Sequence, residues 1–349
     1  MTAVRSSLCI CVLLGMLGCG GPSPGTHEHQ LFAFGTLVEL TFYGISEQQA
    51  REAAQQVDAM YQRQHQDWHA WRRGHLQDLN EAIAENRAVR TDPSILELIQ
   101  LGQHLERISH GFFNPAIGNL LNIWGFQKDE ATQGPPPSAQ SIQRWLSSSP
   151  STLDLQLEGQ VVHSANPAVR LDFGGFAKGY SVGAAVQLIK RQGINDFIVN
   201  AGGDLCVRGK HGQRPWRIGI RDPRDGGVLA SIELTGPACA FTSGDDQRYF
   251  KFGDKRYHHI LDPGTGYPAQ RTRSVTVVDA DPVLADAAAT ALFVAGPARW
   301  EKIARSMGVH EVLLLDDADV AYVTPDLARQ LSYVQKPAKV IVVPLSNAP

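Results

Sequence analysis

The sequence contains no cluster of lysine or arginine and no acidic run. Charged residues make up 19% of its 349 residues, and the formal net charge is −3. Proteins that bind nucleic acid usually present a basic patch or stripe, so this composition argues against nucleic acid as a partner. The chain also has no internal repeat. An apolar run from Leu8 to Leu17 is too short to cross a bilayer as a mature helix.

Two common phosphate-binding motifs are absent, namely Gly-x-x-x-x-Gly-Lys-[Ser/Thr] and Gly-x-Gly-x-x-Gly. The nearest approach is the stretch 170–179 (RLDFGGFAKG), which we expect to be a strand end leading into a helix that ends before Gly193. Amides at a helix N-terminus bind anions, and Lys178 would add a full positive charge. Asp172 could hold a ribose hydroxyl or a metal-bound water. Plain packing of a strand against a helix is the alternative.

The first thirty residues read as a targeting segment, which takes no part in the fold. Residues 1–18 are expected to form a lipoprotein signal peptide, because 16–19 (MLGC) resembles a bacterial lipobox. Cys19 would then carry the lipid, and residues 19–30 would be a flexible tether. Met16 stands where leucine is usual, which leaves an ordinary signal peptide or a retained anchor as alternatives.

Cysteine is scarce in the expected mature chain. Cys9 and Cys11 leave with the signal peptide, and only Cys206 and Cys239 remain beside Cys19. The last two allow one disulfide, but both lie in apolar, strand-like runs. We therefore expect buried free thiols.

Strand meanders mixed with helices, without regular strand–helix–strand alternation, predict an α+β fold. The domain is expected over residues 31–335, with a C-terminal tail at 336–349. The predicted strands are 31–43, 196–207 (interrupted by a Gly-Gly turn), 216–221, 229–234, 238–242, 247–252, 312–315 and 320–323. The predicted helices follow Ser46 and Asp92 and span 282–295 and 297–307.

The aromatic segment 112–126 contains Asn-Pro and two glycines. This composition is typical of irregular chain that lines a cleft, although core aromatics packed under a loop would give the same pattern. The Pro-rich stretch 133–138 reads as a surface loop.

The helix 282–295 is apolar almost all round, so we expect it to be buried. Asp286 and Thr290 are one turn apart and share a face. A buried carboxylate needs a cation or hydrogen-bond donors. Two oxygen ligands, with a backbone carbonyl, waters and phosphate oxygens, suit Mg²⁺. The alternative is an aspartate bonded to backbone amides.

His258 and His259 lie at a strand end before the tight turn 262–266. A histidine there could act as a general base, hold a phosphate, or be merely structural. Zinc is disfavoured because no further cysteine or histidine falls at ligand spacing.

Taken together, these stretches resemble the ApbE family of FAD:protein FMN transferases. The matching segments are 172–180 (DFGGFAKGY), 200–204 (NAGGD), 242–245 (TSGD), 259–266 (HILDPGTG) and 286–290 (DAAAT), with Gly35-Thr36 and 122–126 (NIWGF) in the same order. The resemblance covers about residues 31 to 325. It implies a single compact catalytic domain, in which antiparallel and mixed sheets pack with helices.

The resemblance implies an enzyme that splits the pyrophosphate of FAD with Mg²⁺, passes FMN to a threonine or serine hydroxyl of a partner protein, and releases AMP. The implied metal ligands are the side chains of Asp286 and Thr290, with main-chain help from Gly175 and Ala289. His259 is the implied base. The expected FAD contacts are Phe34, Trp71, Phe112, Phe113, Asn114, Asp172, Lys178 and Ile260.

Four positions depart from the family pattern. Phe34 stands where methionine is usual, Asn114 where aspartate is common, Asn119 where proline is common, and Asp246 where an aromatic residue follows Ser-Gly-Asp. These substitutions affect the expected packing of adenine and flavin. The metal and glycine-turn residues are intact.

The expected partners are FAD and a periplasmic or membrane flavoprotein that carries the acceptor hydroxyl. The expected location is the bacterial cell envelope, with the chain lipid-anchored at the inner or outer membrane and facing the periplasm. Two alternatives remain, a FAD pyrophosphatase and a lipoprotein that holds FAD without chemistry. Asp286, Thr290 and His259 argue against the second.

Overall fold

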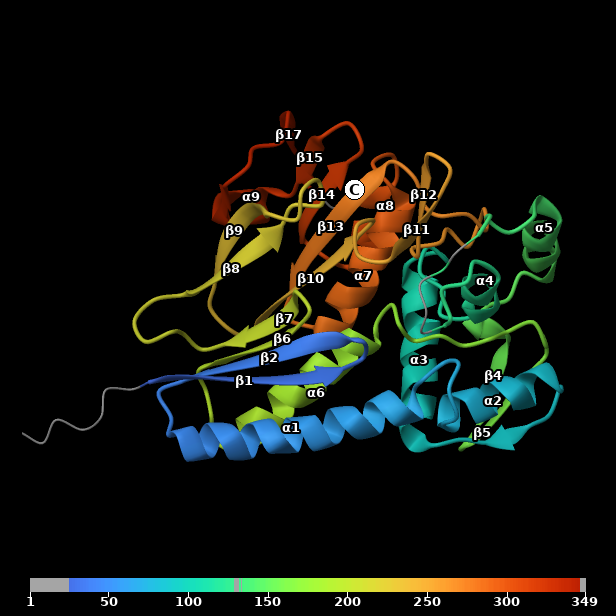
Figure 1. Cartoon of the computed structure of the whole chain (residues 1–349), viewed down its shortest axis with the longest axis horizontal. Coiled ribbons are helices and arrows are strands. Elements are labelled where there is room, and N and C mark those ends of the chain that lie inside the picture. The colour runs from blue at the N-terminus through green and yellow to red at the C-terminus, as the bar shows by residue number, and fades with distance from the viewer. Residues whose placement is uncertain (1–24, 129–131, 133, 346–349) are drawn as a thin grey trace, which may run out of the picture.

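The computed structural model describes residues 25–128, 132 and 134–345. In this part of the chain, the centre of the fold is a nine-stranded sheet (Figure 1). Its order is β1-β2-β6-β7-β10-β13-β14-β15-β17. The strands are β1 (Thr26–Ala33), β2 (Thr36–Tyr43), β6 (Phe197–Ala201), β7 (Asp204–Arg208), β10 (Ala238–Gly244), β13 (Thr272–Asp279), β14 (Glu311–Asp316), β15 (Val320–Val323) and β17 (Lys339–Val342). Neighbouring strands are antiparallel, except that β15 and β17 are parallel.

Helices cover one face of this sheet. They are α1 (Glu47–Asp67), α3 (Pro93–Ile108), α6 (Ala177–Arg191), α7 (Pro282–Ala295) and α8 (Trp300–Met307). α1 packs on β1 and α6, and α7 packs on β10 and β13. The alternating strand residues Val38, Leu40 and Phe42 are fully buried in the core on this side. Burial of such strand faces against helices is the main stabilising term of the domain.

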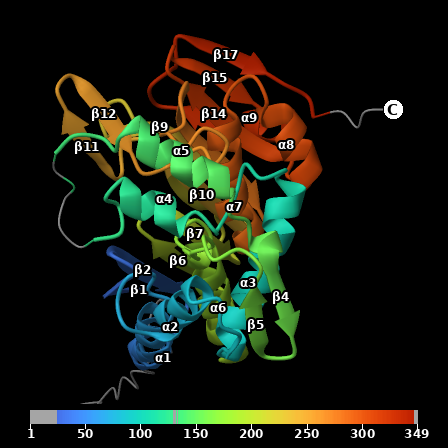
Figure 2. The ribbon, with the colours of Figure 1, turned by 90° about the vertical axis from the view of Figure 1, so that its right-hand side faces the viewer.

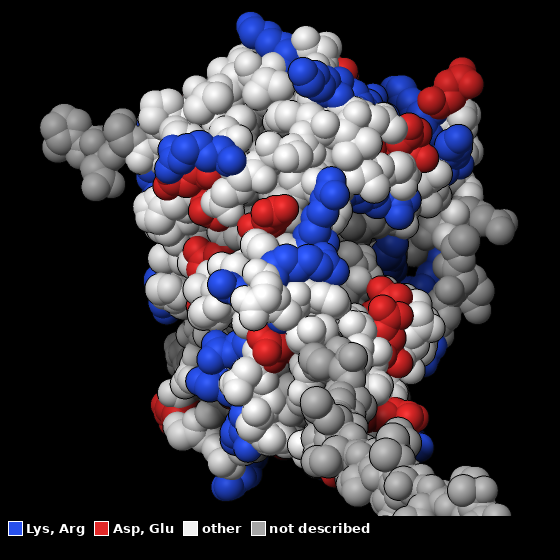
Figure 3. Space-filling view, turned by 90° about the vertical axis from the view of Figure 1, so that its left-hand side faces the viewer, with Lys and Arg blue, Asp and Glu red and all other residues white. Residues whose placement is uncertain are grey.

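A smaller sheet and one helix cover part of the other face (Figure 1). The strands are β8 (Trp216–Arg221), β9 (Val228–Leu234) and β16 (Leu331–Tyr333), and the helix is α9 (Pro325–Gln330). They bury a second core whose members include Ile218, Ile232 and Leu327. On the face of the molecule shown in Figure 3, acidic and basic side chains are interspersed.

The remaining elements form one side of the molecule (Figure 2). They are α2 (His75–Ala84), β3 (Val89–Arg90), α4 (Gly118–Ile123), α5 (Ala139–Ser148), a 3₁₀ turn (Thr152–Asp154), β4 (Leu155–Glu158), β5 (Val161–Ser164), β11 (Tyr249–Phe252) and β12 (Lys255–His258). Trp124, buried after α4, donates from Nε1 to the Gly266 carbonyl at 2.8 Å. The segment 112–126 therefore contains a short helix as well as loop, and its aromatic side chains Phe113, Trp124 and Phe126 are core residues.

The α+β class is confirmed, and several boundaries differ from expectation. The first strand begins at Thr26, inside the predicted tether, and β17 lies in the predicted tail, where it pairs with β15. Arg170 makes only an isolated bridge with Ile117, so the chain before α6 is largely loop. The predicted signal peptide and Cys19 lie outside the described residues. None of the described helices combines the length and the apolar character needed to cross a membrane.

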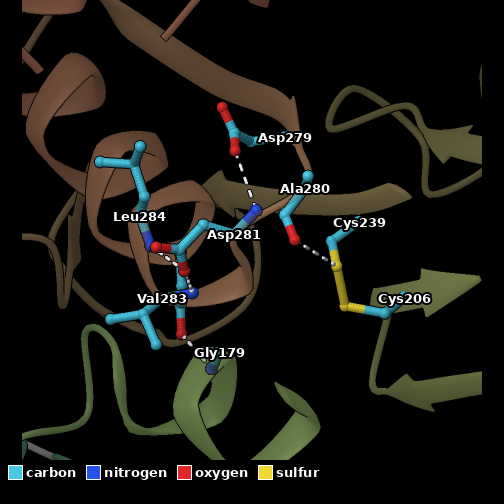
Figure 4. Close-up of a disulfide and its surroundings, with 9 residues drawn as sticks. Gly179, Cys206, Cys239, Asp279, Ala280, Asp281, Val283 and Leu284 are labelled. Carbon is cyan, nitrogen blue, oxygen red and sulfur yellow. Dashed lines mark hydrogen bonds between the residues drawn. A yellow bond between two sulfur atoms is a disulfide. The ribbon is translucent and has the colours of Figure 1, made fainter. Parts of the chain in front are cut away.

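Cys206 and Cys239 form a disulfide, so the expectation of free thiols was wrong (Figure 4). The two residues are direct partners in the antiparallel pairing of β7 and β10. Their sequence separation of 33 residues gave no sign of this register. The disulfide joins β7, which begins at Asp204, to β10, which contains Thr242.

Candidate active site

The site is built where the N-terminal half of α6 crosses the N-terminal half of α7. Gly179 and Gly183 face α7, and a Cβ atom at Gly179 would lie 2.9 Å from the Cβ of Asp286 and even closer to the Pro282 carbonyl. A Cβ at Gly183 would lie 2.9 Å from the Pro282 Cγ. Because both side chains are missing, the helices approach closely enough for the Gly179 N–H to donate to Asp286 Oδ2 at 2.8 Å.

A helix cap and a disulfide lie beside this crossing. Asp281 caps α7 by accepting from the amides of Val283 and Leu284, as its position before Pro282 predicted. Figure 4 shows Gly179 on one side of this first turn and the Cys206–Cys239 bridge on the other. The Cys239 Sγ lies 4.0 Å from the Ala280 carbonyl oxygen.

Three charged groups meet at this crossing. The Lys178 ammonium pairs with Asp204, whose Oδ1 also accepts from the Thr242 N–H at 2.8 Å. Burial by itself would lower the pKa of Lys178, but the carboxylates of Asp204 and Asp286 outweigh it and raise that pKa. Burial raises the pKa of Asp286, and the charge of Asp204 raises it further, against the opposing effect of Lys178. The site therefore favours additional positive charge beside Asp286.

The residues at this crossing fit a hard divalent cation. Asp286 Oδ1 has no hydrogen-bond partner among the described residues, and one turn along α7 the Thr290 hydroxyl lies 3.1 Å from the Ser243 hydroxyl. The described residues contain no group of three or more His, Cys, Asp or Glu that could hold a metal. Mg²⁺ needs no such cage, because it is commonly bound by one or two carboxylates together with waters and substrate phosphates.

His259 lies directly after the β11–β12 hairpin, and its ring is held by that hairpin. Its Nδ1 lies 3.2 Å from the Arg248 carbonyl oxygen, which also accepts from the His259 backbone N–H at 3.0 Å. A ring nitrogen facing a carbonyl must carry the proton, which leaves Nε2 as an acceptor. Burial and the Arg248 charge lower the pKa of His259 to about 3, and the Lys178 charge contributes to this. The imidazole is thus neutral.

The matches to known proteins agree with one another. The family model described as the ApbE family matches residues 34–314. The chain belongs to the ApbE family. It is 39% identical to the FAD:protein FMN transferase of Rhodobacter capsulatus over 98% of this chain and 66% of that protein. It is 30% identical to the FAD:protein FMN transferase of Treponema pallidum, covering 84% of this chain and 85% of that one.

Solved structures of ApbE proteins share the fold. The ApbE protein of Thermotoga maritima superposes with a TM-score of 0.79 at 31% identity, over 88% of this chain and 99% of that one. The flavin transferase ApbE of Vibrio cholerae superposes with a TM-score of 0.76 at 24% identity, over the same shares of the two chains. These matches confirm a single ApbE-type α+β domain.

Within this ApbE-family site, Asp172 is held firmly before α6. Its Oδ1 accepts from the Gly174 N–H at 2.9 Å, and its Oδ2 accepts from Gln127 Nε2 at 2.7 Å. Gly175 packs so tightly that a Cβ there would lie 2.9 Å from the Phe113 ring. The amide that α6 presents at Gly179 binds a carboxylate of the protein itself, so this amide is not available to a ligand anion.

The expected FAD contacts do not all share one surface. The Phe113 ring is buried and meets Phe176 edge to face, whereas the neighbouring Phe112 ring lies under the Arg299 guanidinium at 4.5 Å. Asn114 accepts from the Ala116 N–H at 2.7 Å and donates to the Pro150 carbonyl at 2.9 Å. Ile260 and Ala289 are buried.

Phe34 and Trp71 lie near the end of α1. The Phe34 ring, on a residue with a φ of 53°, meets the Tyr61 ring edge to face. The Trp71 ring contacts that of His69. The indole Nε1 of Trp71 is buried and has no hydrogen-bond partner among the described residues. A ligand acceptor at this point would satisfy it.

Sequence reasoning gave no role to Asp204, Gln127 or Ser243, each of which contacts a predicted site residue. Asp204 offered the clearest signal, because it opens the apolar strand 204–207 and a buried carboxylate needs a cation. Ser243 lies in the matching segment 242–245, but it is uncharged and that resemblance assigned it no role, and Gln127 carried no signal.

Proposed function

We propose that this chain transfers FMN from FAD to a threonine or serine hydroxyl of a partner protein and releases AMP. One observation carries the proposal. Contacts connect the His259 ring to the start of α6: its Nδ1 faces the Arg248 carbonyl, Arg248 donates to the Phe126 carbonyl, and the next residue, Gln127, donates to Asp172. A base for the acceptor and charged groups for a pyrophosphate thus belong to one site.

The transfer is a displacement at phosphorus. The acceptor hydroxyl oxygen attacks the phosphorus atom on the FMN side of the FAD pyrophosphate, forming a phosphoester bond. The bond from that phosphorus to the bridging oxygen breaks, and AMP leaves with the electron pair. The hydroxyl proton passes to His259 Nε2. No oxidant or reductant is needed.

The residues at the crossing of α6 and α7 position the pyrophosphate. Asp204 orients the Lys178 ammonium, and the Gly179 amide fixes the Asp286 carboxylate. Mg²⁺ held by Asp286 and Thr290, with main-chain help from Gly175 and Ala289, would offset the negative charge that develops on AMP. Asp172, Phe34 and Trp71 would contact FAD, and the buried Trp71 indole N–H supports this assignment.

The chain is further proposed to work in the bacterial cell envelope. Cys19 of the lipobox-like segment would carry the lipid and become the first mature residue. The enzyme would then face the periplasm, on the inner or the outer membrane, and its acceptor would be a periplasmic or membrane flavoprotein.

The deciding experiment uses the mature soluble protein with FAD, Mg²⁺ and a periplasmic acceptor domain, followed by mass spectrometry of that acceptor. We expect a covalent FMN adduct that disappears with EDTA. Free FMN and AMP without an adduct would identify a FAD pyrophosphatase, and unchanged FAD would identify a binding protein.

A further inference from the structure

The β11–β12 hairpin stands apart from the sheets of the domain. Its strands pair with each other and, among the described residues, with no other strand. Figure 2 shows the hairpin at the margin of the molecule. The chain leaves it at His258 and enters the site at His259. Any protein that binds the hairpin therefore lies beside the proposed base.

The inner half of the hairpin is fixed to the domain. Phe250 and Tyr257 stack on each other at 5.3 Å, and Tyr257 also packs on Trp124 at 5.5 Å. Phe250 packs on Phe126 at 5.9 Å, and Arg248 donates to the Phe126 carbonyl at 2.7 Å. This aromatic cluster holds the hairpin in place without help from its tip.

The hairpin exposes one large aromatic side chain on each face of the ribbon, because Tyr249, at its base, and Phe252, near its tip, point to opposite sides of β11. Tyr249 is 44% exposed and Phe252 is 48% exposed. Both strands also have outer edges that are unpaired within the described part of the chain. Exposed aromatic rings beside an open strand edge are typical of a surface that binds an extended protein segment.

The exposed surface of the hairpin is also basic. Lys251 and Lys255 are exposed and form no ion pair with any described residue, whereas the neighbouring Arg256 is engaged by Asp245. Asp254 is the one acidic residue between Gln247 and His258. The face in Figure 3, by contrast, mixes the two signs of charge. The hairpin therefore favours an acidic ligand.

We infer that the exposed surface of the hairpin, formed by Tyr249 and Lys251 on one face of the ribbon and by Phe252 and Lys255 on the other, is the docking surface for the flavin acceptor. The partner it fits is a protein with an acidic segment next to its acceptor hydroxyl. The lysines pair with the acidic side chains and the aromatic rings cover the neighbouring apolar atoms. The inference rests on the proposed function, since a transferase must bring a second protein to His259.

The test compares two double variants that change the net charge equally. Lys251→Glu with Lys255→Glu reverses the hairpin, and Lys336→Glu with Lys339→Glu reverses two exposed lysines near β17. The probe is an acceptor domain with acidic residues beside its threonine, at saturating FAD. We expect the hairpin variant to lose at least 10-fold in kcat/KM for the acceptor and to keep the KM for FAD within 2-fold. The control variant should match wild type.

A second acceptor, in which the acidic residues are replaced by Asn and Gln, should react equally with wild type and the hairpin variant. Equal loss in the hairpin and control variants, or no loss in either, overturns the inference. A change in the KM for FAD alone also overturns it, because the hairpin would then belong to the nucleotide site.

Failure of the proposed flavin transfer can be distinguished from failure of the docking surface. If wild type forms no adduct, binding of the same acceptor domain is measured directly by surface plasmon resonance. Weaker binding by the hairpin variant than by the control still supports the docking surface. Equal binding, or none, rejects it.

Discussion

At the crossing of α6 and α7, Lys178, Asp204 and Asp286 are packed together with little solvent, whereas the β11–β12 hairpin turns two lysines and two aromatic rings outward along its length. The first region owes its geometry to missing side chains at Gly179 and Gly183, which let the Gly179 N–H reach Asp286. The second is a two-stranded ribbon anchored at its base. Changes at the crossing should thus affect chemistry and folding together, while changes on the hairpin should affect partner choice alone.

The largest effect is expected from Asp286→Asn. The amide keeps an oxygen for the Gly179 N–H but loses the charge that would hold Mg²⁺. Transfer should fall by about 10³-fold, at the upper end of the cost of removing one electrostatic stabiliser from an active site. Flavin transfer with Mg²⁺ measures the loss, and thermal unfolding checks that the fold persists. Wild-type activity in this variant would remove Asp286 from the metal site.

His259→Ala should slow transfer to the acceptor by about 10²-fold to 10⁴-fold, the usual contribution of a general base. FAD binding, measured by flavin fluorescence, should be unchanged, because within the described part of the chain the deleted ring forms a hydrogen bond only with the Arg248 carbonyl. Loss of FAD binding instead would mean that His259 holds phosphate.

Gly179→Ala tests whether the close approach of the helices is needed. The added methyl group would collide with the Pro282 carbonyl and with Asp286, so we expect a loss of about 2–3 kcal/mol in the free energy of unfolding. Gly102→Ala in α3 is the matched control, because its nearest neighbour would be a Pro115 side-chain carbon at 3.2 Å. Equal urea midpoints for the two variants would contradict the tight crossing.

The smallest effect concerns acid stability near the hairpin. Burial lowers the pKa of His258 to about 4 from an ordinary value of 6.5, and its Nε2 donates to the Ala269 carbonyl at 2.8 Å. The unfolded chain binds this proton first as the pH falls, so stability that is present above pH 6.5 is lost progressively toward pH 4.

The variant His258→Gln should lose less stability over the same pH range, since glutamine can still donate to Ala269 without titrating. Urea unfolding at pH 7 and at pH 4.5 measures the difference between the two proteins. An identical acid loss in wild type and variant would assign the effect to other groups.

The elements of the helix crossing could be predicted from sequence because their signals are local. Asp281 and Pro282 mark the start of α7, and its apolar composition marks it as buried. Its contacts could not be predicted, since Gly179 meets Asp286 across 107 residues and Cys206 meets Cys239 only through strand register. Local patterns carry no information about which strands become neighbours.

The site predictions likewise fall into two groups, those that rested on the local sequence and those that rested on the family resemblance. The sequence pointed to His259, Lys178 and Asp286 because each is a charged or titratable group in an apolar or glycine-rich setting. Asn114 and Phe112 rested on resemblance, and the structure gives them local partners, Pro150 and Arg299. Their contact with FAD stays a prediction.

The central sheet pairs strands that are far apart in the chain. β2 lies beside β6, and the bond from Asn200 to Glu39 spans 161 residues. Loop closure over such distances slows folding, because chain entropy is lost before the long-range contacts form. During synthesis, β2 therefore cannot pair with β6 until that later strand has been made. The crossing of α6 and α7, with its full set of site residues, likewise forms only after α7 has been synthesised.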